Sequence, residues 1–333
     1  MKFSVGYQLR ETSDFAEEIL SKRAQISEVY FSWGDFANGR ASLPLAAGLT
    51  PWEAQERQES ELKAFSDGGI ALNLLFNATC YGRDSLSRAF FTRIGNTVDY
   101  LAGRYALRGI TTTSPLIGRF IHENFPGLDV RASVNMGIGT VEGMDYAAEF
   151  FDSFYLAREM NRDLGRVAEA KAWCEKNGKK LFGLANSGCL NHCSAHVFHD
   201  NLVSHEAEIA AMDNGYAFEG VCRGYLAKTE NRAALLVRTS FIRPEDTALY
   251  EDLFEGLKLA TRVSPCPARI LRAYLAGHFR GNILELLEPN HAGLVYPKVL
   301  ENSRITSRTL NGKLVYGNLE EALIDLEEDY ADE

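Results

Sequence analysis

Short runs of β-forming residues alternate with longer helical stretches along most of this 333-residue chain, and this alternation limits the fold more than any other feature. The eight runs are Phe3–Tyr7, Glu28–Trp33, Ile70–Asn77, Gly109–Ser114, Asp129–Val134, Ser153–Ala157, Lys180–Asn186 and Leu253–Thr261. Strict alternation of strands and helices indicates an α/β protein with a parallel sheet. Eight repeats favour a TIM-like (β/α)8 barrel over an open doubly wound sheet, because no Gly-x-Gly-x-x-Gly follows the first run.

Helix boundaries between these runs are marked by local signals. The stretch Thr50-Pro51-Trp52-Glu53 predicts a helix start with a capping box and proline at the first helical position. The helical stretch 162–177 is followed by Gly178, a residue typical of the C-terminal end of a helix. The helical segments are therefore expected to begin and end between the strands.

Two segments are additional to the eight strands and helices of a minimal barrel. Residues 187–252 form a long insertion between the seventh and eighth strands, where barrel enzymes build their active sites. Residues 288–333 predict a small C-terminal appendage of strand and hairpin character, with runs at 294–300 and 307–316, the second around Asn311-Gly312. We therefore expect a barrel domain over 1–287 and an appendage over 288–333.

The formal charge of −10 is concentrated at the C-terminal end. Residues 320–333 contain eight acidic side chains and no Lys or Arg, so the rest of the chain carries only about −2. We interpret these residues as a solvated tail or a fraying helix. A nearly neutral body gives no indication of nucleic-acid binding. No run approaches a membrane span and no secretory signal is evident at the start, so a cytoplasmic protein without membrane contact is expected.

Four of the six cysteines, Cys189, Cys193, Cys222 and Cys266, fall within 78 residues that connect the seventh strand to the end of the eighth. Parallel strands of a barrel end at the same rim, so these thiols are expected to meet there. Four thiolates suit a [4Fe–4S] cluster or a structural Zn²⁺. Their irregular spacing favours the cluster, although the residues alone leave zinc, or no metal, open.

The remaining cysteines and two histidines have more than one interpretation. Cys189, Cys193, His196 and His199 could by themselves form a compact zinc site, or the two histidines could face a substrate, contact cluster sulfurs or cap a buried turn. Cys174 is expected in the core of a helix. Cys80, beyond the third strand, is either a fifth thiol near the site or a buried loop residue.

Basic side chains lie near the ends of several predicted strands. Arg131, Arg158, Lys258 and Arg262 could together bind a small dianion, since guanidinium groups bind carboxylates with two parallel hydrogen bonds. The alternative is an internal network in which these cations pair with acidic residues such as Glu159, Glu245 and Asp246.

Several stretches, taken in order, resemble the peptidase U32 family, whose members were named as collagenase-like peptidases. They are Arg-Glu-Met-Asn-Arg at 158–162, the cysteine cluster after the seventh strand, Phe-Ile-Arg-Pro-Glu-Asp at 241–246 and Leu-Lys-Leu-Ala-Thr-Arg at 257–262. The resemblance covers roughly residues 1–287 and is strongest over 158–287.

The resemblance implies a TIM-like barrel that carries a [4Fe–4S] cluster, with Cys189, Cys193, Cys222 and Cys266 as its ligands. It also implies a redox enzyme of the oxygen-independent hydroxylation type, because several members act in the hydroxylation of RNA bases or of ubiquinone precursors, with prephenate as oxygen donor. We therefore expect an iron–sulfur barrel protein that acts with a small anionic co-substrate.

Two alternative functions stay open. The family name suggests a metal- or cysteine-dependent peptidase, although the chain contains no His-Glu-x-x-His and no Cys/His pair with an evident orienting partner. The other alternative is a non-catalytic iron–sulfur subunit that acts beside a second barrel chain.

Overall fold

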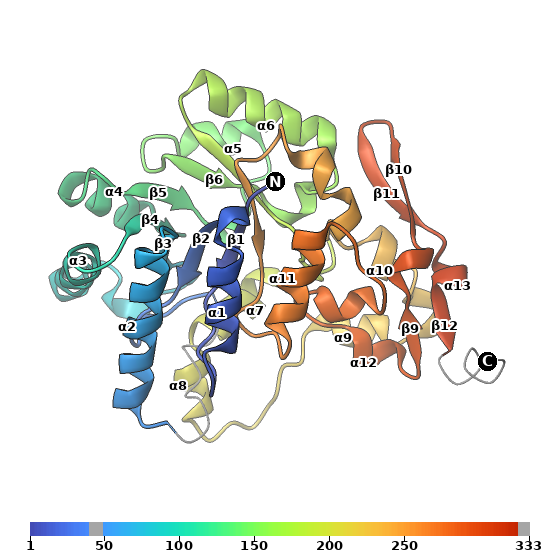
Figure 1. The fold of residues 1–333 in the computed structure, drawn as a ribbon, viewed down its shortest axis with the longest axis horizontal. Helices are drawn as coiled ribbons and strands as arrows, with labels where there is room; N and C mark the ends of the chain where they lie inside the picture. The colour runs from blue at the N-terminus through green and yellow to red at the C-terminus, as the bar shows by residue number, and fades with distance from the viewer. Residues whose placement is uncertain (40–48, 326–333) are drawn as a thin grey trace.

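The computed structural model describes residues 1–39 and 49–325, and its first eight strands close into one parallel barrel in chain order (Figure 1). The strands are β1 Phe3–Gly6, β2 Ile26–Phe31, β3 Ala71–Phe76, β4 Leu107–Thr112, β5 Asp129–Ala132, β6 Ser153–Tyr155, β7 Lys180–Leu184 and β8 Gly256–Leu259. Strand β1 pairs with β2 on one side and with β8 on the other, which closes the barrel. The prediction of an α/β TIM-like barrel is confirmed.

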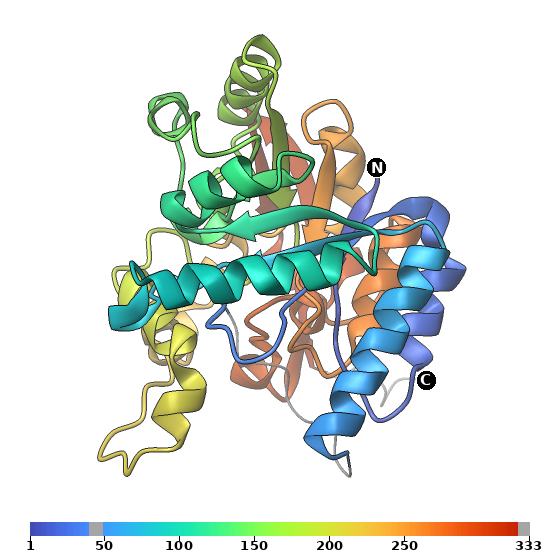
Figure 2. The same cartoon turned by 90° about the vertical axis from the view of Figure 1, so that its left-hand side faces the viewer.

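Helices follow the strands and surround the barrel (Figure 2). They are α1 Asp14–Ser21, α2 Pro51–Asp67, α3 Arg88–Ala102, α4 Pro115–Asn124, α5 Val141–Tyr146, α6 Leu164–Lys176 and, after β8, α11 Pro267–Ala276. The expected capping box is present at α2, where Thr50 and Glu53 bond each other's backbone N–H groups. Helix α6 ends at Lys176, and Gly178 takes the left-handed backbone conformation expected after a helix.

The long connection after β7 is a helical insertion. It contains α7 His196–Ser204, α8 Glu206–Ala210, α9 Val221–Leu226 and α10 Ala234–Val237, followed by a 3-10 helix at Pro244–Tyr250 that leads to β8. In Figure 2 the yellow α7–α8 segment extends as an arm beyond the barrel helices. The base of the insertion is tied to the rim, because Leu190 bridges to Thr239 and the Ile242 N–H bonds the Ala185 carbonyl at 2.7 Å.

The C-terminal appendage lies at the side of the barrel. It contains α12 Ala292–Val295, β9 Lys298–Leu300, β10 Thr306–Leu310, β11 Lys313–Gly317, α13 Leu319–Ala322 and β12 Leu323–Asp325. The β10–β11 hairpin closes at Leu310 and Lys313, with Asn311 and Gly312 both at positive φ, as the Asn-Gly pair predicts.

Two expectations about the appendage are corrected. Residues 294–300 form the end of α12 and the short strand β9, not one continuous strand. Residues 320–322 of the acidic tail lie in helix α13, whereas residues 323–325 form β12, which pairs with β9 and so belongs to a sheet. Residues 326–333 of the expected tail lie outside the described part of the chain.

Arg243 links the appendage to the barrel. Its buried guanidinium donates to the side chain and carbonyl of Asn302 at 2.8 and 2.9 Å and to the Ile305 carbonyl at 2.9 Å. The apolar core is continuous from the barrel into the appendage, where it includes Leu300 and Tyr316. The domain boundary at 287/288 stays a prediction. Within the described ranges, no helix has both the length and the apolar character of a membrane span.

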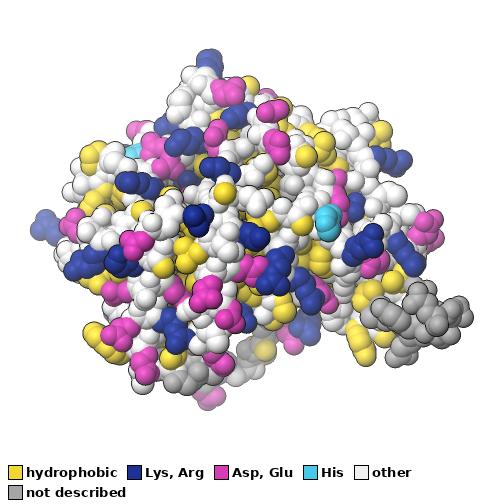
Figure 3. Space-filling model, viewed as in Figure 1, with side chains coloured by type: hydrophobic (Ala, Val, Ile, Leu, Met, Phe, Trp, Pro, Cys, Tyr) yellow, Lys and Arg dark blue, Asp and Glu magenta, His cyan; other side chains and the backbone are white. Residues whose placement is uncertain are grey.

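The surface carries charges of both signs. On the face shown in Figure 3, Lys and Arg side chains are interspersed with Asp and Glu, and no continuous basic stripe crosses it. This face therefore offers no extended electrostatic footprint of the kind that tracks a nucleic-acid backbone.

Candidate functional site

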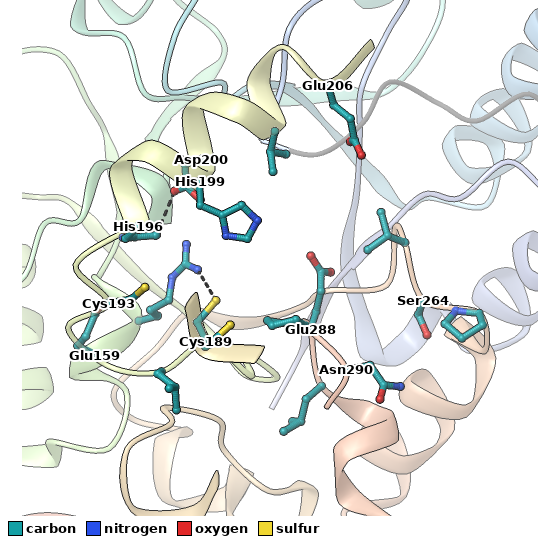
Figure 4. Close-up of a pocket in the computed structure, with 18 residues that line it drawn as sticks. Glu159, Cys189, Cys193, His196, His199, Asp200, Glu206, Ser264, Glu288 and Asn290 are labelled. Atoms are coloured by element: carbon teal, nitrogen blue, oxygen red, sulfur yellow. Dashed lines mark hydrogen bonds and ion pairs between the residues drawn. The ribbon is translucent and has the colours of Figure 1, made fainter. Parts of the chain in front are cut away.

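A cavity of about 430 Å³ opens at the end of the barrel to which the C-termini of the strands point. Its walls come from the loops after β6, β7 and β8, from α7 and α9 of the insertion, and from residues 287–290. Figure 4 shows Cys189, Cys193, His196, His199 and Glu288 arranged around it. In a TIM barrel this end carries the active site, so we call this space the cysteine pocket.

Three of the four predicted ligands, Cys189, Cys193 and Cys222, line the cysteine pocket. They arrive from the loop after β7, from the turn before α7 and from the first turn of α9. Burial raises the pKa of the Cys222 thiol, and the proximity of Cys189 and Cys193 adds to this effect. The structure thus brings together three thiols that are up to 33 positions apart in the sequence.

The loop that carries Cys189 is held against residues 286–291. The buried Asn186 amide donates to the carbonyls of Leu286 and Ala260 at 2.7 and 3.0 Å. At Gly188 an added Cβ would lie 2.3 Å from the Pro289 carbonyl oxygen, so only glycine permits this approach. The position of Cys189 therefore depends on a small residue immediately before it.

The fourth predicted ligand, Cys266, is exposed at the N-cap of α11 and does not line the cysteine pocket. The residues just before it, Val263, Ser264 and Pro265, do line the pocket. Among the described residues, no three His, Cys, Asp or Glu side chains are grouped closely enough to hold a single metal ion. The three pocket thiols therefore share one cavity without surrounding a common point.

Arg158 is the basic residue closest to the thiols. It follows β6, is 5% exposed, and donates from Nη1 to Cys189 Sγ at 3.1 Å and from Nη2 to Asn135 Oδ1 at 3.2 Å. Within the described ranges no carboxylate lies within 4.0 Å of its guanidinium, and its Nε has no partner. The predicted alternative, pairing with Glu159, Glu245 or Asp246, is thus not realised by Arg158.

A second, smaller cavity of about 50 Å³ lies next to the cysteine pocket inside the barrel mouth. Arg158 and Glu288 line both cavities, and Lys258 and Arg262 line the smaller one. We call this space the basic cavity. Three of the four predicted anion-binding residues therefore meet at one place, from the loop after β6 and from the end of β8.

Lys258 is a strongly perturbed group of the basic cavity. Burial, reinforced by the neighbouring Arg262 guanidinium, lowers the pKa of Lys258 to about 7. Its Nζ lies 3.9 Å from the centre of the Tyr30 ring. Arg262 is oriented by hydrogen bonds to Ser32 Oγ and Asn38 Oδ1 at 3.1 and 2.8 Å.

Arg131, the fourth predicted anion-binding residue, lines neither cavity. Its guanidinium lies in the barrel interior, where Nη1 bonds Glu28 Oε1 at 2.7 Å and Nη2 bonds Asp129 Oδ2 at 2.9 Å. It also lies 3.8 Å from the centre of the Phe182 ring. Arg131 is therefore part of an internal ion-pair network, the alternative that the sequence left open.

The two predicted histidines line the cysteine pocket. His196 Nε2 pairs with Asp200 Oδ2 at 3.0 Å, one turn further along α7. His199 packs against the edge of the Phe218 ring, and in Figure 4 its imidazole points into the cavity, as does the Glu288 carboxylate. Sequence reasoning missed Glu288, although its position in the polar run Glu288-Pro289-Asn290-His291 after the last barrel helix is a detectable signal.

The cysteines outside the predicted set occupy different environments. Cys174 is fully buried in α6, as expected, and burial raises the pKa of its thiol to about 12. Cys80 is half-buried in the loop after β3 and does not line the cysteine pocket. Neither thiol therefore adds to the three that meet there.

Comparisons with known proteins support the resemblance drawn from the sequence. No family model matches the chain. The chain is 27% identical over 301 residues to "Uncharacterized protease MJ1657" of Methanocaldococcus jannaschii, and the match covers 87% of this chain and 82% of that protein. The solved structure of the U32 peptidase Mk0906 superposes with a TM-score of 0.55 at 16% identity, over 78% of this chain and 91% of the other, and so shares the fold.

Proposed function

We propose that this chain belongs to the peptidase U32 family and is an iron–sulfur redox enzyme whose barrel mouth binds a small anionic co-substrate. One observation carries the proposal. Arg158 lines both the cysteine pocket and the basic cavity, and its guanidinium touches Cys189. A co-substrate bound by Arg158 would therefore lie next to whatever the thiols hold.

The cofactor we propose is a [4Fe–4S] cluster bound by Cys189, Cys193, Cys222 and Cys266. Three thiols from separate segments in one cavity provide three of the four thiolates that such a cluster takes. The exposed Cys266 follows directly after pocket-lining residues, so a local change of the loop would bring its thiol to the cavity. Such a cluster supplies one-electron transfer, and zinc stays the alternative occupant of the same thiols.

The residues of the basic cavity would bind and orient the co-substrate. Arg158 and Arg262 present guanidinium groups that suit a carboxylate, and protonated Lys258 adds a third positive charge below about pH 7. The volume of about 50 Å³ accommodates one small group, such as a carboxylate, with the rest of the molecule in the adjoining pocket. Glu288 and His199 point into the cysteine pocket and would exchange protons with that molecule.

The reaction type is the least constrained part of the proposal. Oxygen-independent hydroxylation is taken from the family resemblance, and the residues described above account for co-substrate binding and proton exchange only. We further propose that the protein works in the cytoplasm, because its six cysteines are free thiols. The name of the methanogen relative keeps a peptidase as the alternative activity.

A non-catalytic role beside a second barrel subunit is favoured by one separate observation. The arm formed by the insertion exposes several large apolar side chains to solvent. Val197 is 72% exposed, Met212 68% and Tyr216 98%. Such a group of apolar side chains is typical of a protein–protein contact. Co-purification of a second barrel chain through this arm would support that alternative.

The proposal is tested by anaerobic purification followed by quantification of iron, sulfide and zinc, with an absorption spectrum near 400 nm. We expect about four irons and four sulfides per chain. Cys189→Ser, Cys193→Ser, Cys222→Ser and Cys266→Ser should each lower the iron content, whereas Cys80→Ser, which lies outside the pocket, should not. Stoichiometric zinc without sulfide would refute the redox function and favour a hydrolase.

A further inference from the structure

The loop after β3 is fixed against α7 of the insertion. The Thr79 N–H donates to Ser204 Oγ at 3.0 Å, and Thr79 Oγ1 donates to Asn201 Oδ1 at 2.7 Å. The pocket-lining residues His199 and Val203 lie on a different side of the helix from Asn201, as its 3.6-residue period requires. Neither Thr79 nor Cys80 lines the cysteine pocket or the basic cavity, so this loop is separate from the proposed cluster and co-substrate sites.

The next residue of the loop, Cys80, completes a row of three groups. Its thiol is hydrogen-bonded to the imidazole of His205, and His205 Nδ1 bonds Glu208 Oε2 at 3.1 Å. The Gly82 N–H points at Cys80 Sγ at 3.4 Å. The position of a Cβ on Gly82 lies 3.9 Å from His205 Cε1, which independently locates the ring beside this loop.

The contacts of Cys80 Sγ favour the ionised form of the thiol. His205 Nδ1 faces Glu208, so Nε2 is the ring nitrogen left for Cys80. The sulfur also accepts the Gly82 N–H, and hydrogen bonds to a sulfur favour its negatively charged form. The hydrogen bond from His205 lowers the pKa of the Cys80 thiol, and the same bond raises the pKa of His205.

From this geometry we propose that Cys80, His205 and Glu208 form a second active site, in which Cys80 is the nucleophile for hydrolysis of activated acyl compounds, namely thioesters or aryl esters. A thiolate paired with an imidazolium that a carboxylate orients is the arrangement of covalent thiol catalysis. The thiol is half-buried and the Glu208 side chain is 76% exposed, so an acyl group can approach from solvent.

The reaction balances without an external oxidant or reductant. Cys80 Sγ attacks the carbonyl carbon, an S–C bond forms, and the bond to the leaving group breaks. The leaving group departs with the electron pair and takes the proton from His205 Nε2. Water then attacks the thioester, gives a proton to His205, and releases the carboxylic acid and the thiolate. We propose acyl compounds with good leaving groups as substrates, because Cys80, His205 and Glu208 provide one proton donor and few hydrogen-bond donors for a developing oxyanion.

The test follows acetyl transfer from 4-nitrophenyl acetate to the full-length protein at pH 7. We expect a burst of nitrophenolate, and peptide mass spectrometry after an acid quench should find the acetyl group on Cys80. Cys80→Ser abolishes the burst. His205→Ala slows acetylation by about tenfold, because an ordinary thiol is only a few per cent ionised at pH 7 and a thiolate of low pKa is intrinsically less nucleophilic.

A matched control separates catalysis from folding. His122 forms an equivalent imidazole–carboxylate pair with Asp152 at 2.9 Å at a different place in the fold, so His122→Ala should acetylate at the wild-type rate. Added imidazole should restore acetylation to His205→Ala, and the alkylation rate of Cys80 by iodoacetamide should exceed that of glutathione in the wild type. If Cys80 reacts with both reagents at the rate of glutathione, and His205→Ala behaves like His122→Ala, the proposal is wrong.

Discussion

Lys258 offers the most direct test of the basic cavity, because a buried amine that keeps its charge destabilises the fold. Burial and the Arg262 guanidinium lower the pKa of Lys258 from 10.5 to about 7. At about 1.4 kcal/mol per pKa unit, the charged amine destabilises the folded protein by up to about 5 kcal/mol. We therefore expect Lys258→Met, with a side chain of similar length, to be more stable than the wild type by up to about 5 kcal/mol at pH 6.

The pH dependence has a definite sign. Below about pH 7 the amine is charged in both the folded and the unfolded protein, so the full destabilisation is present. Between about pH 7 and 10.5 the unfolded chain keeps the proton and the folded chain does not, so the destabilisation by Lys258 shrinks as the pH rises. Near pH 10.5 the folded amine is neutral and the unfolded amine is half protonated, so the advantage of Lys258→Met should nearly disappear.

Urea denaturation of the wild type and Lys258→Met at pH 6 and pH 10 measures this difference. Lys63→Met is the matched control, because Lys63 is 64% exposed and only pairs with Asp67 along α2. The control should change stability by less than about 1 kcal/mol at either pH. Two results would contradict this reasoning: a Lys258→Met protein that is less stable than the wild type at pH 6, or one whose stability gain is the same at both pH values. Either would show that the charge on Lys258 does not destabilise the folded protein.

Three further outcomes are expected. Arg262→Ala should weaken binding of malonate, a small dicarboxylate, by about tenfold to a hundredfold, since a charge-assisted pair contributes about 1.5–3 kcal/mol. A thermal-shift titration measures this affinity, and the iron content should not change. Unchanged malonate affinity would show that Arg262 is not part of the anion site. Arg131→Met should destabilise the fold by about 3–5 kcal/mol, because Glu28 and Asp129 lose their buried partner. Its malonate affinity should stay at the wild-type value. A stable variant that binds malonate weakly would show that Arg131 belongs to the anion site and not to an internal ion-pair network. Gly188→Ala should lower the melting temperature and the iron content together, because the added Cβ would lie 2.3 Å from the Pro289 carbonyl oxygen and overpacking costs about 1–3 kcal/mol. Gly127→Ala is the control, and it should change neither quantity because the space around Gly127 is open.

The barrel was predictable because its signals are local. Each strand is a short β-rich run, such as Lys180–Leu184, and the observed boundaries differ from the expected ones by only a few residues. Closure follows from the count, since an eighth parallel strand can return to the first, as Leu257 does opposite Phe3. The β9–β12 pair was missed because it joins segments more than 20 residues apart, and the acidic side chains around them indicated a solvated tail.

The candidate site was predictable only to the level of strand ends. The rule that parallel strands end at one rim correctly groups Cys189 with Arg158 and Lys258. It does not resolve the direction of a side chain within a loop, and so Cys266 lies outside while its three preceding residues lie inside.

The row Cys80, His205 and Glu208 gave no sequence signal that distinguishes it from unrelated residues. Cys80 and His205 are 125 positions apart, and they meet only because the insertion folds back over the loop after β3. Glu208 is three positions after His205, a spacing that is common on any helix surface. Tertiary structure was therefore needed to find an orienting partner for a Cys/His pair.

The four basic residues at the barrel mouth show how structure separates a stabilising charge from a binding charge. Arg131 has two carboxylates within 2.9 Å, so its desolvation is compensated inside the fold. Among the described residues, neither Arg158 nor Lys258 has a carboxylate within 4.0 Å, and both line the same cavity. An internal ion pair needs no ligand, whereas buried cations without a carboxylate partner are stabilised when an anion enters. The same argument predicts that malonate stabilises the protein more at pH 6 than at pH 8, because only the protonated form of Lys258 contributes to its binding.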